Sequence, residues 1–157
     1  MIVLGIDPGK QGGLSFFETN FGETFIGVEK LPENARELHE LIESIQVVEK
    51  VSAAYLEQIY LPAGKAGSLA FGAGWGKIIA VLEMLDIQTH LVRPQVWMRD
   101  LGCMTRGDKN VTKQKAQSLF GGTEYEDGRK IPITHWSSDA LLIGYYGYNQ
   151  EVEKWIK

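Results

Sequence analysis

The chain has 157 residues, the length of one ordinary domain, and its composition of 44% hydrophobic and 23% charged residues is typical of globular proteins. Its formal net charge of -4 argues weakly against a nucleic-acid partner. No apolar run reaches the length of a membrane span, and the single cysteine, Cys103, excludes an internal disulfide. We therefore predict one domain over residues 1–157, in an intracellular, cytoplasmic protein that has no secretory signal and no membrane partner.

Strands come first along the chain, and strands alternate with helices later. Three stretches rich in apolar and aromatic residues predict an antiparallel meander at the start. A segment with apolar residues at helical spacing follows, and from there the two kinds of pattern alternate. The expected strands are residues 2–6, 12–20, 22–30, 51–57 and 87–92, and the expected helices are residues 32–48, 74–86, 93–102, 110–121 and 137–155.

This order of elements predicts an α/β fold, a sheet with helices on both faces. Two glycine-rich segments, residues 62–76 and 120–130, are expected to be loops, the first of them a mobile segment at a functional edge. The first segment contains Gly72, Gly74 and Gly76 but lacks the Lys and Ser or Thr that end a phosphate-binding loop. It therefore does not predict nucleotide binding.

Two acidic residues stand at the ends of predicted apolar strands. Asp7 follows the first strand and precedes Pro8 and Gly9, and Glu57 ends the strand over residues 51–57. If these strands are neighbours, both carboxylates emerge at one edge of the sheet, where α/β proteins place their ligands. The alternative for Asp7 is an ordinary turn, in which the carboxylate accepts hydrogen bonds from the loop backbone.

Asp139 is a third acid, near the start of an otherwise apolar last helix. Three bare carboxylates at the ends of core elements repel one another strongly, and a divalent metal relieves that repulsion. Mg²⁺, with Mn²⁺ as an alternative, prefers oxygen ligands, and two such ions per site support phosphodiester hydrolysis. The alternative is an acid that stabilises the positive end of the helix dipole and does nothing else.

His135 precedes Asp139 by four residues and is a fourth candidate for the catalytic site. If the last helix begins at Thr134, the two side chains share one face, and the imidazole can order an attacking water or lie beside a metal. If Ser137 is the N-cap instead, His135 lies outside the helix.

Basic residues are concentrated in one part of the chain. Residues 18–57 carry nine acidic and three basic side chains, whereas residues 87–122 carry six basic and two acidic ones. One basic face on an acidic molecule is expected of a protein that binds a phosphate backbone, although a solvated helix face gives the same pattern. The candidate DNA-binding residues in this stretch are Arg106, Lys109, Lys113 and Lys115.

Four segments together resemble the RuvC-type Holliday junction resolvases of the ribonuclease H-like superfamily. They are "GIDPG" around Asp7, "LEQIYLPAGKAGSLAFGAGWGKIIAVL" around Glu57, "RPQVW", and "DALLIGYYG" from Asp139 onward. These segments follow the family's order over most of the chain, and the short length and the last segment resemble the phage-type branch. The resemblance implies a ribonuclease H-like mixed five-stranded sheet flanked by helices on both faces.

The same resemblance implies a function in DNA recombination and repair. It implies a crossover junction endodeoxyribonuclease, a homodimer that resolves four-way or other branched DNA by two-metal-ion hydrolysis with paired symmetric nicks. Asp7, Glu57 and Asp139 would be its metal-binding catalytic acids. His135 is assigned with an offset, because Trp136 stands at the position three before the last Asp.

The resemblance also implies a role for Tyr60, which follows Glu57 by three residues. The family has an aromatic residue there that contacts unstacked bases near the junction centre, and stacking on bases tolerates many sequences. The alternative is a tyrosine that packs on the sheet edge. The basic stretch lies where the family supplies phosphate contacts, and the sequence identifies no helicase partner. Competing functions are a ribonuclease H that cuts RNA–DNA hybrids and a nucleic-acid-binding module without catalysis.

Overall fold

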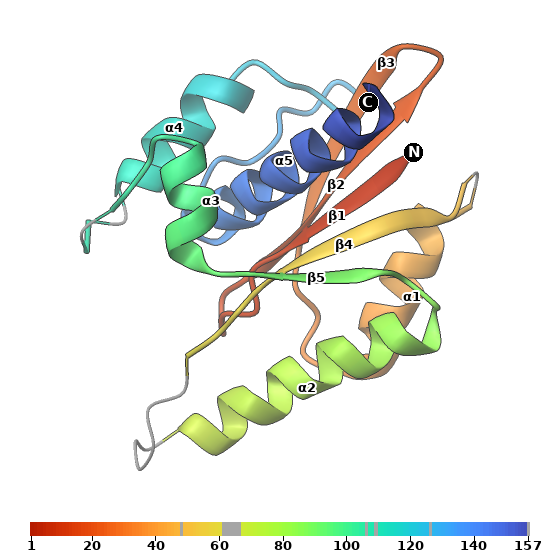
Figure 1. Ribbon diagram of the computed structural model, residues 1–157, viewed down its shortest axis with the longest axis vertical. Coiled ribbons are helices and arrows are strands. Elements are labelled where there is room, and N and C mark those ends of the chain that lie inside the picture. Colours follow the sequence, from red (N-terminus) through yellow and green to blue (C-terminus); the bar gives the residue numbers. More distant parts are fainter. Residues whose placement is uncertain (48, 61–66, 106, 109, 126, 157) are drawn as a thin grey trace.

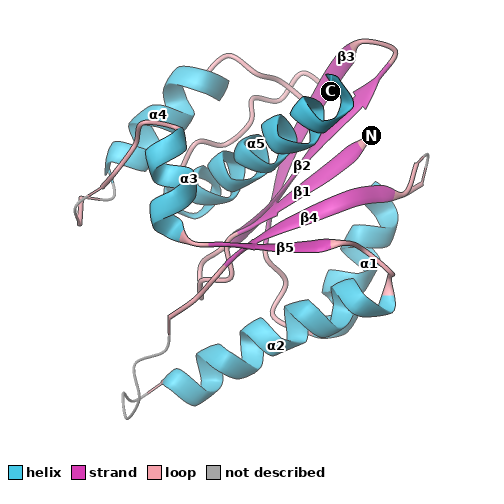
Figure 2. Ribbon diagram, viewed as in Figure 1, coloured by secondary structure: helices cyan, strands magenta, loops and turns pink. Residues whose placement is uncertain are grey.

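Figure 1 shows a computed structural model of the chain, which describes residues 1–47, 49–60, 67–105, 107–108, 110–125 and 127–156, without the side chains of 155 and 156. The described strands form one mixed sheet in the order β3-β2-β1-β4-β5 (Figure 2). The central strand β1 pairs antiparallel with β2 and parallel with β4, and the outer pairs continue these directions. The strands are β1 (Ile2–Ile6), β2 (Gly13–Asn20), β3 (Glu23–Lys30), β4 (Val51–Glu57) and β5 (Thr89–Val92).

Helices cover both faces of this sheet. In Figure 1, α1 and α2 lie on one side, and α3, α4 and α5 lie on the other. The predicted α/β architecture, a mixed five-stranded sheet between helices, is confirmed. The helices are α1 (Ala35–Ile45), α2 (Ser68–Met84), α3 (Pro94–Asp100), α4 (Asn110–Phe120) and α5 (His135–Ile156).

The sheet has a separate apolar core on each face because side chains alternate along a strand. In β1, Ile2, Leu4 and Ile6 belong to the core under α1 and α2, whereas Val3 belongs to the core under α5. In β4, Tyr55 is likewise part of the α5-side core. A strand buried on both faces is expected to be apolar throughout, as the sequence of β1 is.

The helix starts differ most from prediction at α1 and α2. Asn34 is the N-cap of α1, since its side chain accepts a hydrogen bond from the amide of Glu37 at 2.9 Å, so Pro32 lies before the helix. The structure begins α2 at Ser68, six residues before the predicted start at Gly74, in a segment expected to be a loop. Each isolated glycine costs a helix about 1 kcal/mol, and the neighbouring Leu69, Ala70 and Ala73 are good helix formers. Residues 62–66 of that expected loop lie outside the described residues.

None of the helices in the described ranges is both long enough and apolar enough to span a membrane.

Candidate active site

The carboxyl ends of β1 and β4 bring Asp7 and Glu57 together. These strands are parallel neighbours, and Ile6 pairs with Leu56 in their register, so the next residue on each strand is an acid. By the alternation of side chains, Glu57 shares the α5-side face with Tyr55. The predicted meeting of two carboxylates at one sheet edge is therefore borne out by the strand register.

Asp7 also has the role in a turn that was considered as its alternative. Its Oδ1 accepts a hydrogen bond from the amide of Gly9 at 3.0 Å, and its own amide donates to the carbonyl of Gly13 at 3.0 Å. These bonds hold the carboxylate at the carboxyl end of β1, and they do not neutralise its charge. The turn positions the acid, so the two roles are compatible.

Helix α5 is held against β1 by close backbone contact and against β2 by a side-chain hydrogen bond. A Cβ atom on Gly5 would lie 2.1 Å from the amide nitrogen of Gly144, so neither backbone has room for a side chain there. The buried hydroxyl of Ser15 donates to the carbonyl of Ala140 at 2.7 Å. Ala140 follows Asp139, so these contacts fix the height of Asp139 above the sheet.

The start of α5 decides between the two predicted positions of His135. The amide of Ser138 donates to the carbonyl of Thr134 at 3.0 Å, and the Ser137 hydroxyl accepts from the amide of Thr134 at 2.9 Å. Thr134 is thus the N-cap, and His135 is the first helical residue, exposed to solvent. His135 and Asp139 are one turn apart and lie on the same side of the helix.

The electrostatics of Glu57 show that the three acids are neighbours. Its pKa is raised from 4.5 to about 7, first because the carboxyl is buried and then because of the nearby charge of Asp7. Asp139 raises the pKa of Glu57 further, while a hydrogen bond from Trp97 lowers it. Raised carboxyl pKa values of this kind are typical of functional sites.

The donor set fits a divalent cation of the magnesium type. Among the residues that the structure describes, no three His, Cys, Asp or Glu side chains stand close enough to hold one ion together. Mg²⁺, however, is commonly bound by one or two carboxylates, with water and phosphate oxygens completing its shell. Glu57 with either neighbouring acid supplies such a pair, and a cation would relieve the repulsion that raises its pKa.

Comparison with known proteins identifies the fold. No protein-family model and no curated protein sequence matches the chain. RuvC from Thermus thermophilus superimposes over 96% of this chain and 97% of its own, with a TM-score of 0.55 and 14% identity. The fowlpox virus resolvase in complex with Holliday junction DNA covers 100% of both chains, with a TM-score of 0.52 and 14% identity. The yeast mitochondrial Holliday junction resolvase Ydc2 covers 98% of this chain and 80% of its own, with a TM-score of 0.53 and 14% identity. This chain has the RuvC-type fold.

Two tryptophans that the sequence did not single out bind Glu57 at this edge of the RuvC-type fold. The indole Nε1 of Trp97, in α3, donates to Oε2 of Glu57 at 3.0 Å, and Trp75, in α2, donates to the main-chain oxygen of Glu57 at 3.3 Å. Trp97 lies in the quoted segment "RPQVW", but a tryptophan at that place predicts core packing unless its partner is known. Only the fold brings α3 against the end of β4.

Tyr60 does not pack on the sheet edge, the alternative considered for it, since its side chain is 92% exposed. It lines a hollow of about 560 Å³ beside Glu57, together with Phe71 and Arg93. An exposed aromatic ring and a guanidinium next to a candidate catalytic carboxylate would suit an unpaired nucleotide. Arg93 was counted in the basic stretch but not proposed as a site residue.

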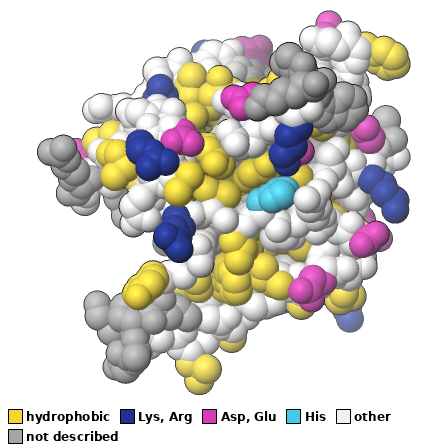
Figure 3. All heavy atoms as spheres, in the orientation of Figure 1, with side chains coloured by type: hydrophobic (Ala, Val, Ile, Leu, Met, Phe, Trp, Pro, Cys, Tyr) yellow, Lys and Arg dark blue, Asp and Glu magenta, His cyan; other side chains and the backbone are white. Residues whose placement is uncertain are grey.

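The predicted basic residues are described in part. Lys113 and Lys115 are half-buried on α4, while Arg106 and Lys109 lie outside the described residues. Burial raises the pKa of the Cys103 thiol, the charge of Lys115 lowers it and that of Asp139 raises it, so Lys115 and Asp139 both lie near Cys103. The Lys and Arg side chains on the face in Figure 3 are scattered over it and form no continuous basic surface there.

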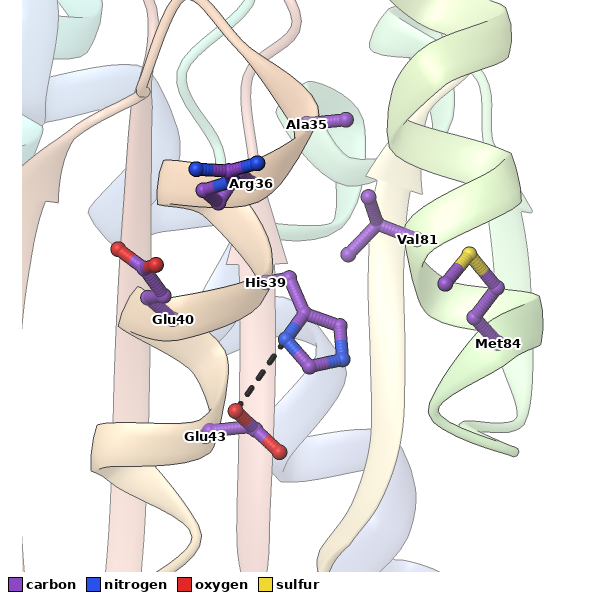
Figure 4. Close-up of a pocket in the computed structure, with 7 residues that line it drawn as sticks. All are labelled: Ala35, Arg36, His39, Glu40, Glu43, Val81 and Met84. Carbon is purple, nitrogen blue, oxygen red and sulfur yellow. Dashed lines mark ion pairs between the residues drawn. The ribbon is translucent and has the colours of Figure 1, made fainter.

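A second hollow, of about 470 Å³, lies between α1 and α2 on the opposite side of the sheet from α5 (Figure 4). His39 and Glu43 on α1 form an ion pair at 3.2 Å across one helical turn, facing Val81 and Met84 of α2. His39 therefore lies at the surface, half-buried. His90 lies on β5 with its ring against Tyr55, away from the three acids along the strand.

Proposed function

We propose that this protein is a metal-dependent DNA endonuclease that resolves four-way junctions. The observation that carries the proposal is the in-register placement of Asp7 and Glu57 on parallel strands, with Asp139 electrostatically coupled to Glu57. The fold supports it, since solved structures that share this fold include RuvC and the fowlpox resolvase bound to Holliday junction DNA. We extend that substrate class to this chain.

In this proposal, Asp7, Glu57 and Asp139 hold Mg²⁺ or Mn²⁺, two ions per site. The bound cations supply Lewis-acid chemistry, favouring attack by water on a phosphodiester and stabilising the leaving oxygen. The burial of Glu57 strengthens every charge interaction at the site, because the local dielectric is lower than that of water. His135 is exposed one turn before Asp139, so its imidazole can orient a water or accept its proton.

The neighbouring residues would bind the DNA. Tyr60 stacks on an unpaired base at the junction centre, and Lys113 and Lys115, with Arg106 and Lys109, contact phosphates. Cuts on opposed strands require two sites, which a homodimer with one acid cluster per subunit supplies. The exposed Leu69 and Met84 on α2 support that helix as the contact between subunits.

The proposal is tested by incubating the purified protein with a four-way DNA junction, a matched linear duplex and an RNA–DNA hybrid, with Mg²⁺ or with a chelator. We expect metal-dependent cleavage of the junction, and no cleavage of the linear duplex or of the hybrid. Cleavage of the hybrid alone would favour a ribonuclease H on the same fold. Junction binding without any cleavage, with either metal, would favour a binding module.

A further inference from the structure

Trp97 is fully buried, and its polar atom faces a charged group. The ring belongs to the α5-side core with Tyr55 and Val92, and its indole Nε1 donates to Oε2 of Glu57 at 3.0 Å. A buried indole N–H needs an acceptor, which is usually available from the main chain. Here the acceptor is the carboxylate of the candidate metal site.

This hydrogen bond restricts how the Glu57 carboxylate can turn. With Oε2 held by a ring that is packed on all sides, the direction of Oε1 is set by the core of the protein. Trp75 provides a natural comparison, because its indole donates to the main-chain oxygen of Glu57. The first bond ends on the carboxylate, whereas the second ends on the main chain and does not contact the carboxylate.

We propose that Trp97 is a positioning residue: its indole N–H orients the Glu57 carboxylate for a divalent cation. The inference rests on the proposed function, because it needs Glu57 to be a metal ligand. Partners that orient a ligand by hydrogen bonding typically contribute 10- to 100-fold to metal affinity or activity. If Trp97 serves packing alone, its loss lowers stability and leaves metal affinity unchanged.

The test compares three proteins: the wild type, Trp97→Phe and Trp75→Phe. Phenylalanine keeps an aromatic ring at each position and removes one N–H bond to Glu57. Mn²⁺ binding is measured without DNA by calorimetry, and thermal unfolding in a chelator reports the stability of each fold. We expect Trp97→Phe to weaken Mn²⁺ binding about 10-fold or more, and Trp75→Phe to keep the wild-type affinity.

Junction cleavage provides a second readout. For Trp97→Phe, the Mg²⁺ concentration that gives half the maximal rate should rise by the same factor as the Mn²⁺ dissociation constant, with most of the rate restored at saturating Mg²⁺. If Trp97→Phe does not fold, replacement of Trp97 by benzothienylalanine decides the matter, because sulfur there replaces the N–H in a ring of the same shape. That protein should fold and show the weakened metal binding.

A folded variant without the Trp97 N–H that binds Mn²⁺ as tightly as the wild type would overturn the inference. An equal loss in Trp75→Phe would also overturn it, since a general disturbance around Glu57 would then explain both. If the wild-type protein binds no Mn²⁺, the proposed metal site itself is refuted. The titration of the wild type distinguishes this outcome from the two above.

Discussion

Gly5 of β1 and Gly144 of α5 touch backbone to backbone, with 2.1 Å between a Cβ built on Gly5 and the amide nitrogen of Gly144. This contact sets the distance between the helix that carries Asp139 and the strand that leads to Asp7. The two glycines are 139 positions apart in the chain, and neither lies in the acid cluster. The geometry of the candidate site therefore depends on two residues without side chains.

Gly5→Ala should unfold the protein more easily and abolish junction cleavage. The added methyl group must push α5 away from the sheet, and overpacking of this kind costs about 3 kcal/mol. Urea unfolding measures the loss. Gly76→Ala is the control, since nothing lies within 4 Å of a Cβ at Gly76 and alanine favours a helix by about 0.5 to 1 kcal/mol. Equal stability of Gly5→Ala and wild type would contradict the close contact.

Without metal, the protein should lose stability as the pH rises from about 4.5 to about 7. The pKa of Glu57 is 4.5 in the unfolded chain and about 7 in the fold. In this window the folded state retains a proton that the unfolded chain has released, so the free energy of unfolding falls as pH increases. The contribution of Glu57 is at most about 3 kcal/mol.

Glu57→Gln isolates this contribution, because glutamine has nearly the same shape and does not titrate. Unfolding of both proteins in a chelator, at about pH 5 and about pH 8, should show a smaller pH dependence in the variant. Added Mg²⁺ should stabilise the wild type at the higher pH and leave the variant less affected. An identical pH dependence in the two proteins would show that Glu57 titrates normally.

Reversing the charge of Lys113 and Lys115 together should weaken junction binding and reduce its salt dependence. Each lost phosphate contact lowers the slope of log affinity against log salt by about one unit. Lys50→Glu is the control. Lys50 is exposed and precedes β4, so it lies at the opposite end of that strand from Glu57. An unchanged slope in the double variant would make this part of α4 an ordinary solvated surface.

Tyr60→Ala should lower the rate of junction cleavage roughly tenfold or more without weakening metal binding. A base stacked on an aromatic ring contributes about 1 to 3 kcal/mol. Since Tyr60 is 92% exposed, its removal should change stability by less than about 0.5 kcal/mol, so the rate reports a direct contact. A wild-type rate on junctions, measured below saturation, would exclude Tyr60 from DNA binding.

The strands and the acids could be predicted because their patterns are local. An apolar run followed by an acid predicts both a strand and an acidic side chain at its carboxyl end, as in β1 and β4. The start of α2 could not be predicted this way, because Gly72, Gly74 and Gly76 suggest a loop, whereas the helix begins at Ser68.

The rest of the candidate site depends on contacts between distant segments. The bond from Trp97 to Glu57 joins residues 40 positions apart, and the sequence alone gives Trp97 no acceptor. The role of Gly144 also depends on a distant segment. A glycine inside a helix suggests lower helix stability, and only the contact with Gly5 of β1 shows why this position has no side chain. The position of His135 was left between two alternatives that only the hydrogen bonds of Thr134 decide.

The most direct test of the central claim maps the cuts that the protein makes in a four-way junction labelled on each strand in turn, with Mg²⁺ present. We predict paired nicks at symmetric positions on two opposed strands by the wild type. Asp7→Asn, Glu57→Gln and Asp139→Asn should bind the junction and make no cut, because each removes one ligand charge at nearly constant shape. Cleavage at the wild-type rate by any of the three variants, or an uncut junction with the wild type, would contradict the account.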